Sequence, residues 1–182
     1  RRIFERSRKA EENSSTGSIV MEKPTAIDVF SGGGGLTVGL KRSGFNVVAA
    51  IEIESSAFAT YKSNHPEVQV YKQDVRTIEG DILSRFSPTG IIDLLSGCPP
   101  CQGFSSLTSK YRREDARNDL VLEMARLIME IRPRAVMMEN VPGLIKKGKS
   151  LFDELVDVLI RLGYLPEWAV LQDADYGVPQ SR

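Results

Sequence analysis

The chain has 182 residues, which suits one compact domain and is too short for two of ordinary size. Hydrophobic residues make up 41% of it and charged residues 26%, as in soluble globular proteins. The 24 Lys and Arg residues balance the 24 Asp and Glu residues, so any attraction to phosphate must come from local patches.

The sequence indicates neither a membrane protein nor a secreted one. No apolar run approaches the ~20 residues that span a bilayer, and no signal peptide opens the chain. The two cysteines, Cys98 and Cys101, are too few for a disulfide framework, and with His65 as the one histidine they do not supply a zinc-ligand set. We therefore expect an intracellular protein without a metal site, in the cytoplasm or nucleoid if it is bacterial.

Residues 1–23 differ from the rest of the chain. They are rich in Arg, Lys, Glu and Ser and poor in apolar residues, which predicts a solvated, charged extension. The folded domain is expected to occupy residues 24–182.

From Thr25 onward, short β-rich runs alternate with helical patterns. The predicted elements, in chain order, are a strand at Thr25–Phe30, a helix from the glycine loop to about Ser43, a strand at Asn46–Ile53, a helix at Ser55–Asn64, a strand at Val68–Tyr71, a short helix at Gly80–Phe86, a strand at Ile91–Ser96, a helix from Leu120 to Ile131 that Pro133 ends, a strand at Ala135–Met138, a helix from Leu151 to Leu162 and a strand at Leu165–Leu171. This alternation, with strands apolar throughout, predicts an α/β fold in which helices cover both faces of a mostly parallel sheet.

The first predicted strand runs into a glycine loop, DVFSGGGGL, at residues 28–36. Glu52 ends the second strand, where an acid can accept hydrogen bonds from ribose hydroxyls, and Asp74 follows the third strand, within reach of an adenine edge. Thr37 stands where the dinucleotide fingerprint needs its third glycine. The pattern therefore favours an adenosine-containing ligand without a pyrophosphate, although a plain flexible turn is the alternative.

The fourth predicted strand opens into a cysteine loop, GCPPCQGFS, at residues 97–105. Pro99 and Pro100 stiffen the backbone before Cys101, which would need electropositive surroundings to lower its pKa from about 8.5 and act as a nucleophile. Cys98 and Cys101 also fit a C-x-x-C dithiol redox site, or two inert small residues. We favour Cys101 as a nucleophile with Cys98 as a buried neighbour.

Four motifs in order resemble those of the cytosine-C5 DNA methyltransferase family. They are the glycine loop, Pro100-Cys101-Gln102 with Phe104-Ser105, Glu139-Asn140-Val141, and DYGVPQSR at residues 175–182. The resemblance runs from about Ala26 to Arg182. It implies a Rossmann-like methyltransferase fold that uses S-adenosyl-L-methionine, here without its last strands.

The resemblance implies three catalytic residues. The thiolate of Cys101 would add to C6 of cytosine and thereby activate C5, and Glu139 would protonate or hydrogen-bond N3. The apolar strand before Glu139 would raise its pKa. Arg182 matches the first arginine of the family's Gln-x-Arg-x-Arg motif and would lie near the nucleophile.

The resemblance also implies the residues of the donor site. Glu52 would bind the ribose and Asp74 the adenine amino group, while apolar side chains form the wall. The full predicted set is Asp28, Phe30, Ser31, Gly32, Gly34, Gly35, Leu36, Glu52, Ile53, Asp74, Val75, Pro100 and Leu120.

The partner implied by the resemblance is double-stranded DNA. The target cytosine must leave the base stack, and the segment Ser105–Asn118, with Lys110, Arg112, Arg113 and Arg117, resembles the loop that closes over it. The family's target-recognition domain does not occur within the sequence. We therefore expect a fragment, or one subunit of a split enzyme, that does not methylate DNA unaided; a non-catalytic donor- or nucleic-acid-binding module and a tRNA methyltransferase are the alternatives.

Overall fold

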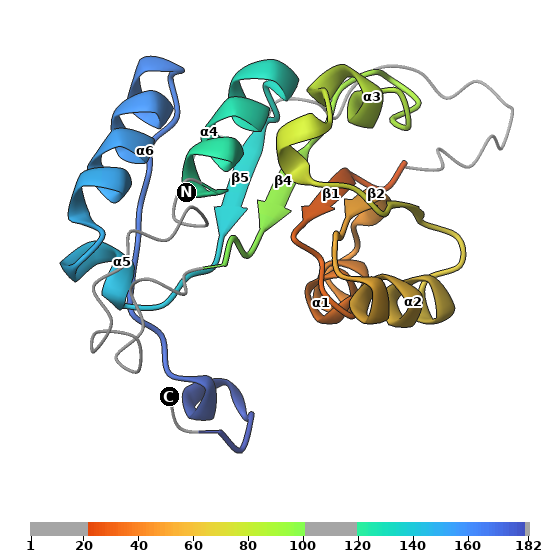
Figure 1. Cartoon of the computed structure of the whole chain (residues 1–182), viewed down its shortest axis with the longest axis horizontal. Coiled ribbons are helices and arrows are strands. Elements are labelled where there is room, and N and C mark those ends of the chain that lie inside the picture. Colours follow the sequence, from red (N-terminus) through yellow and green to blue (C-terminus); the bar gives the residue numbers. More distant parts are fainter. Residues whose placement is uncertain (1–21, 101–119, 181–182) are drawn as a thin grey trace, which may run out of the picture.

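The computed structural model describes residues 22–100 and 120–180. Within these residues, five strands form one parallel sheet in the order β3-β2-β1-β4-β5 (Figure 1). The predicted α/β architecture is confirmed. The strands are β1 (Thr25–Val29), β2 (Asn46–Ile51), β3 (Gln69–Tyr71), β4 (Leu94–Gly97) and β5 (Ala135–Met138).

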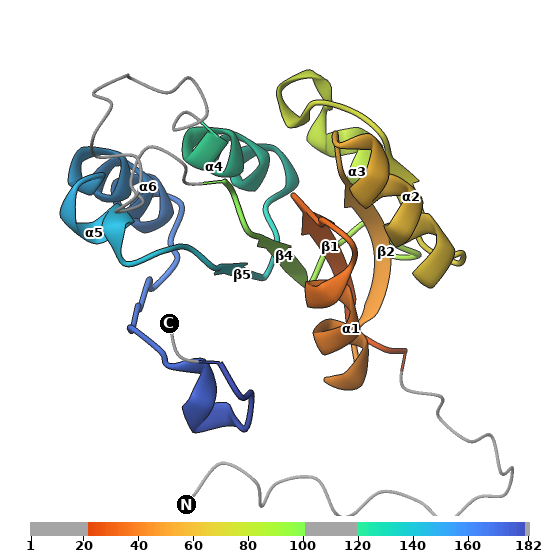
Figure 2. The same cartoon turned by 60° about the horizontal axis from the view of Figure 1, so that its bottom comes forward.

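Helices lie on both faces of the sheet, with α4 and α6 on the opposite side from α1 (Figure 2). In the described ranges, no helix is both long and apolar enough to cross a membrane. The helices are α1 (Gly35–Arg42), α2 (Ser55–Asn64), α3 (Gly80–Ser84), α4 (Leu120–Ile131), α5 (Gly143–Lys146) and α6 (Lys149–Arg161), and two 3₁₀ turns are η1 (Val75–Thr77) and η2 (Asp173–Tyr176).

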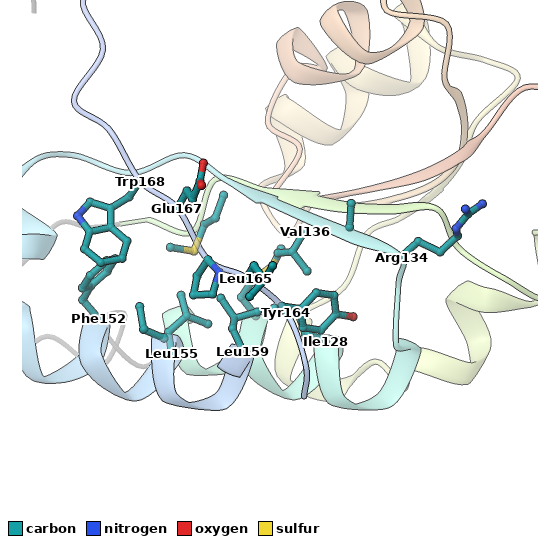
Figure 3. Close-up of a pocket in the computed structure, with 15 residues that line it drawn as sticks. Ile128, Arg134, Val136, Phe152, Leu155, Leu159, Tyr164, Leu165, Glu167 and Trp168 are labelled. Carbon is teal, nitrogen blue, oxygen red and sulfur yellow. The ribbon is translucent and has the colours of Figure 1, made fainter. Parts of the chain in front are cut away.

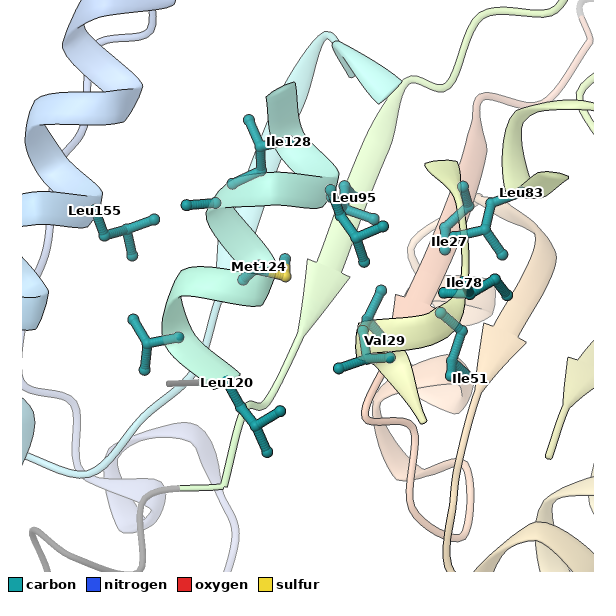
Figure 4. Packing of buried hydrophobic residues seen from close by; sticks show 14 of the residues in the cluster. Ile27, Val29, Ile51, Ile78, Leu83, Leu95, Leu120, Met124, Ile128 and Leu155 are labelled. Atoms are coloured by element: carbon teal, nitrogen blue, oxygen red, sulfur yellow. The ribbon is translucent and has the colours of Figure 1, made fainter. Parts of the chain in front are cut away.

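The apolar strands are explained by burial on both faces of the sheet. Alternate side chains of β1 point to opposite sides. Ile27 and Val29 pack into a cluster that includes Met124 of α4 (Figure 4), whereas Ala26 joins a second cluster with Tyr61 of α2. Each helical layer therefore covers its own apolar core.

Strand β4 begins at Leu94 and not at the predicted Ile91. Side-chain hydrogen bonds occupy the backbone just before it: the Thr25 hydroxyl donates to the carbonyl of Ile91 at 3.1 Å, and the amide of Thr25 donates to the carboxylate of Asp93 at 2.8 Å. These contacts replace backbone pairing on the side that faces β1, while the carbonyls of Ile92 and Asp93 still accept the amides of Arg134 and Ala135 at 3.0 and 2.9 Å.

The prediction of a sixth strand at Leu165–Leu171 is wrong, because this segment is extended but pairs with no strand of the described sheet. Its first residues and those of β5 both line an apolar cavity of about 350 Å³ (Figure 3). Trp168 packs instead edge-on against Phe152 of α6, with ring centroids 5.1 Å apart. Pro166 also lacks an amide donor.

Candidate functional site

The carboxyl ends of four strands meet along one edge of the sheet. Val29 is in register with Ile51 of β2 and with Gly97 of β4, and Gly97 with Met138 of β5. The residues that follow these positions therefore emerge side by side. In open α/β sheets this edge is where ligands bind.

The glycine loop turns sharply between β1 and α1. The amide of Gly34 donates to the carbonyl of Ser31 at 3.0 Å, and Gly34 has φ = 95°. A Cβ on Gly34 would lie 2.5 Å from the ring of His65, so no larger residue fits there. Phe30 also has a positive φ of 59°, which is rare for a bulky residue and marks a strained position beside the loop.

Glu52 is held in place by two backbone amides. Its Oε2 accepts a hydrogen bond of 2.8 Å from Gly32 and its Oε1 one of 2.7 Å from Glu54. Each carboxylate oxygen keeps a second lone pair. Glu52 is thus oriented by the glycine loop and still able to accept further hydrogen bonds.

A cavity of about 360 Å³ opens beside these residues. Its apolar wall includes Ile53, which is 59% exposed despite being a large aliphatic side chain. Seven residues of the predicted donor site line it: Phe30, Glu52, Ile53, Asp74, Val75, Pro100 and Leu120. Ile51, Gln73, Arg76 and Cys98 complete the lining.

The other six predicted donor residues do not line this cavity. Gly32 adjoins it through its bond to Glu52. Ser31 is buried and donates to the carbonyl of Ile51 through its amide at 3.0 Å and its hydroxyl at 3.2 Å. Leu36 packs against the core beneath α1 and α2. Asp28 lies under α1, and Gly34 and Gly35 form the start of that helix.

Asp74 caps the 3₁₀ turn η1 at the rim of the cavity. Its Oδ1 accepts from the amide of Arg76 at 3.0 Å, and its Oδ2 from the guanidinium of Arg76 at 3.1 Å. The carboxylate therefore has a fixed orientation at the end of β3.

Among the predicted catalytic residues, only Glu139 lies within the described ranges. Cys101, Arg182 and the segment Ser105–Asn118 lie outside them. Glu139 follows β5 and is exposed, so the apolar surroundings predicted for it are not found. Beside it, the side-chain amide of Asn140 donates to the carbonyl of Pro99 at 3.0 Å and ties the two loops together.

Cys98 is a free, half-buried thiol next to Glu139. The amide of Glu139 donates to the carbonyl of Gly97 at 3.1 Å, which places the two residues alongside each other. Burial, followed by the nearby carboxylates of Glu139 and Asp28, raises the pKa of the Cys98 thiol to about 12. Cys98 is therefore protonated at neutral pH and unsuited to act as a thiolate.

Sequence reasoning missed the residues that support the site from behind. Arg126 of α4 donates to the carbonyl of Val75 at 2.8 Å and pairs with Glu123 and Glu130. Thr37 and Tyr61 form a buried hydrogen-bonded pair between α1 and α2. The Arg126–Val75 and Thr37–Tyr61 contacts join segments 51 and 24 residues apart, and no local pattern signals them.

Comparison with known proteins gives the family. A model of the C-5 cytosine-specific DNA methylases matches residues 25–182. The chain is 39% identical over 167 residues to the type II methyltransferase M.XorII of Xanthomonas oryzae pv. oryzae, covering 89% of this chain and 39% of the relative. It is 40% identical over 159 residues to M.NgoMIV of Neisseria gonorrhoeae, covering 87% of this chain and 49% of the relative.

The fold is also shared with a solved structure. That structure is a mutant of Spodoptera frugiperda DNMT2. The two structures match with a TM-score of 0.70 and 25% sequence identity, and the match covers 87% of this chain and 47% of the DNMT2 chain. The chain thus spans less than half the length of these three proteins. From the matched family model and the relatives, the chain belongs to the C-5 cytosine-specific DNA methylase family.

Proposed function

We propose that this chain is the donor-binding and catalytic part of an enzyme that methylates C5 of cytosine in DNA. The observation that carries the proposal is the cavity at the carboxyl edge, where seven residues predicted for the donor site come together from separate parts of the sequence. Family membership supports the reaction.

The cavity fits S-adenosyl-L-methionine in size and chemistry. Its volume of about 360 Å³ falls in the range of small-molecule pockets. Ile53, Val75 and Leu120 offer an apolar wall for adenine, and Glu52 offers carboxylate oxygens to the ribose hydroxyls. When bound, this donor supplies an electrophilic methyl group on a sulfonium.

The chain's own residues would activate the cytosine. The thiolate of Cys101 adds to C6, which breaks the aromaticity of the ring and makes C5 nucleophilic; Glu139 supplies a proton or hydrogen bond to N3, where negative charge develops. Transfer of the methyl group from the sulfonium to C5 would leave the donor as a neutral thioether. A base then takes the C5 proton, and its electrons re-form the C5–C6 double bond as Cys101 leaves as a thiolate. Arg182 and the cations of Ser105–Asn118 would contact the flipped base and DNA phosphates.

The high pKa of Cys98 supports the assignment of the thiolate to Cys101 and disfavours a dithiol redox site, which needs both thiols to react. DNA containing 5-fluorocytosine tests the assignment of the thiolate to Cys101. In this base fluorine replaces the C5 hydrogen and cannot be removed as a proton, so elimination stops and the covalent adduct with the enzyme persists. The assay uses the chain with the remainder of the enzyme supplied in trans, and tRNA as a competing substrate.

We expect Cys98→Ser to trap DNA as the wild type does and Cys101→Ser to trap none. Trapping that needs Cys98 would refute the proposal, and so would adducts formed only with tRNA. Binding of donor and DNA without any adduct would indicate a non-catalytic module.

A further inference from the structure

The chain's one histidine, His65, contacts the glycine loop although it lies outside the cavity. His65 caps the carboxyl end of α2 and is only 5% exposed. Its Nε2 lies 3.1 Å from the carbonyl oxygen of Gly34, and its Nδ1 lies 2.9 Å from Nζ of Lys41 on α1. Gly34 belongs to the predicted donor set, whereas His65 and Lys41 belong to neither the donor nor the catalytic set.

The two partners fix the hydrogen of the imidazole. A carbonyl oxygen can only accept, so Nε2 carries the hydrogen and donates to Gly34. A lysine ammonium can only donate, so Nδ1 accepts from Lys41, which also forms an ion pair with Glu67. His65 is therefore oriented by two partners, with Nε2–H as the donor toward Gly34.

A series of hydrogen bonds connects this contact to the cavity. The carbonyl of Gly34 also accepts the amide of Val38, the first bond of α1, at 3.1 Å. The amide of Gly34 closes the turn onto Ser31 at 3.0 Å, and the next residue, Gly32, donates to Glu52 at 2.8 Å. His65 thus holds one end of a short turn whose other end orients the carboxylate in the cavity.

We propose that His65 is a positioning residue for donor binding: its Nε2–H holds the glycine loop in the shape that presents Glu52 to the adenosyl ligand. This inference rests on the proposed function of the cavity. A net hydrogen bond of ordinary strength corresponds to a change in donor affinity of roughly 3- to 10-fold. The alternative is that His65 only fills space beside Tyr61 and Gly34.

Three substitutions separate the two roles. His65→Phe keeps a ring of similar size and removes both polar contacts. His65→Gln carries an amide N–H about as far from the backbone as Nε2, and His65→Asn carries an amide that reaches only as far as Nδ1. The dissociation constant of S-adenosylhomocysteine, the donor without its methyl group, is measured by calorimetry, with thermal unfolding of each variant in parallel.

We expect His65→Phe and His65→Asn to weaken binding ~3- to 10-fold and His65→Gln to restore most of the loss. In the reconstituted enzyme the same loss should appear in KM for the donor, with kcat little changed. If His65→Phe does not fold, the comparison of Asn with Gln makes the same test.

Equal affinity of wild type and His65→Phe would overturn this inference alone, and so would a His65→Gln variant as weak as His65→Phe. A wild-type chain that fails to bind S-adenosylhomocysteine would overturn both the donor site and the role of His65.

Discussion

The hydroxyl of Thr37 donates a hydrogen bond of 2.6 Å to Oδ2 of Asp28 beneath the first turn of α1. The hydroxyl of Tyr61 lies 2.8 Å from the same Thr37 oxygen, so three buried side chains form one series of contacts. Among the described residues, no group donates to the other oxygen of Asp28. Burial raises the pKa of Asp28 from 3.8 to about 6, although the Thr37 bonds oppose the shift.

The raised pKa of Asp28 predicts a dependence of stability on pH. Since the folded state holds this proton more tightly than the unfolded state, the contribution of Asp28 is most favourable below about pH 4 and is lost as the pH rises through about 6. The loss amounts to about 3 kcal/mol, from ~1.4 kcal/mol per unit of pKa.

Asp28→Asn should remove this dependence. We expect the variant to gain about 2–3 kcal/mol relative to wild type between pH 4 and pH 7, measured by urea unfolding at four pH values. If the free energies of unfolding of wild type and Asp28→Asn differ by the same amount at every pH in this range, the raised pKa of Asp28 is contradicted.

Replacement of Gly34 by alanine should damage the glycine loop. The new Cβ would lie 2.5 Å from the His65 ring at a backbone φ of 95°. We expect a loss of stability of about 1–3 kcal/mol and donor affinity weaker by at least roughly tenfold. Thermal unfolding and calorimetry measure the two effects.

Gly39→Ala is the matched control for Gly34→Ala. Gly39 lies in the same helix and is exposed, and a Cβ added to it would have nothing within 4 Å. Stability should rise by about 0.5–1 kcal/mol with donor affinity unchanged. Equal changes in stability and in donor affinity for Gly34→Ala and Gly39→Ala would contradict a special requirement for glycine at position 34.

Ile53 should contribute to donor binding and little to folding, because its side chain is 59% exposed at the cavity. We expect Ile53→Ala to change stability by less than about 0.5 kcal/mol and to weaken donor binding by roughly 1–2 kcal/mol. Ile160→Ala, at a side chain 57% exposed on α6, is the control and should alter neither quantity. A comparable effect of both variants on binding would remove Ile53 from the site.

Arg126 should stabilise the cavity wall at Val75, to whose carbonyl it donates at 2.8 Å. Arg126→Met leaves this carbonyl, Glu123 and Glu130 without the cation, and should cost about 1–2 kcal/mol of stability and weaken donor binding. Lys149→Met removes an exposed pair with Asp153 and should cost less than about 0.5 kcal/mol. Chemical unfolding of both variants gives the comparison.

The sequence predicts the sheet well because its strands are apolar on both faces and the helices between them have clear periodicity. It also predicts that Glu52 and Asp74 lie at the same edge of the sheet, since the carboxyl ends of parallel strands meet there. The sixth strand is wrong because β propensity at Leu165–Leu171 says nothing about whether a neighbouring strand is within reach.

Tertiary contacts account for what the sequence does not reveal. From the sequence alone, Thr37 only replaces the third glycine of the dinucleotide motif, and His65 is only the one histidine of the chain. In the structure, Thr37 of α1 binds Asp28 and His65 at the end of α2 binds Gly34, so both residues support the glycine loop. Their partners lie between 9 and 31 residues away, so local patterns carry no trace of the contacts.

The most direct test of the donor site is calorimetric titration of the chain and its Glu52→Gln variant with S-adenosyl-L-methionine. We predict binding of one donor per wild-type chain and affinity at least roughly tenfold lower in the variant, because the neutral amide is a weaker acceptor for the ribose and for the amide of Gly32. No binding by the wild type, or equal affinity of the two proteins, would contradict the assignment of this cavity.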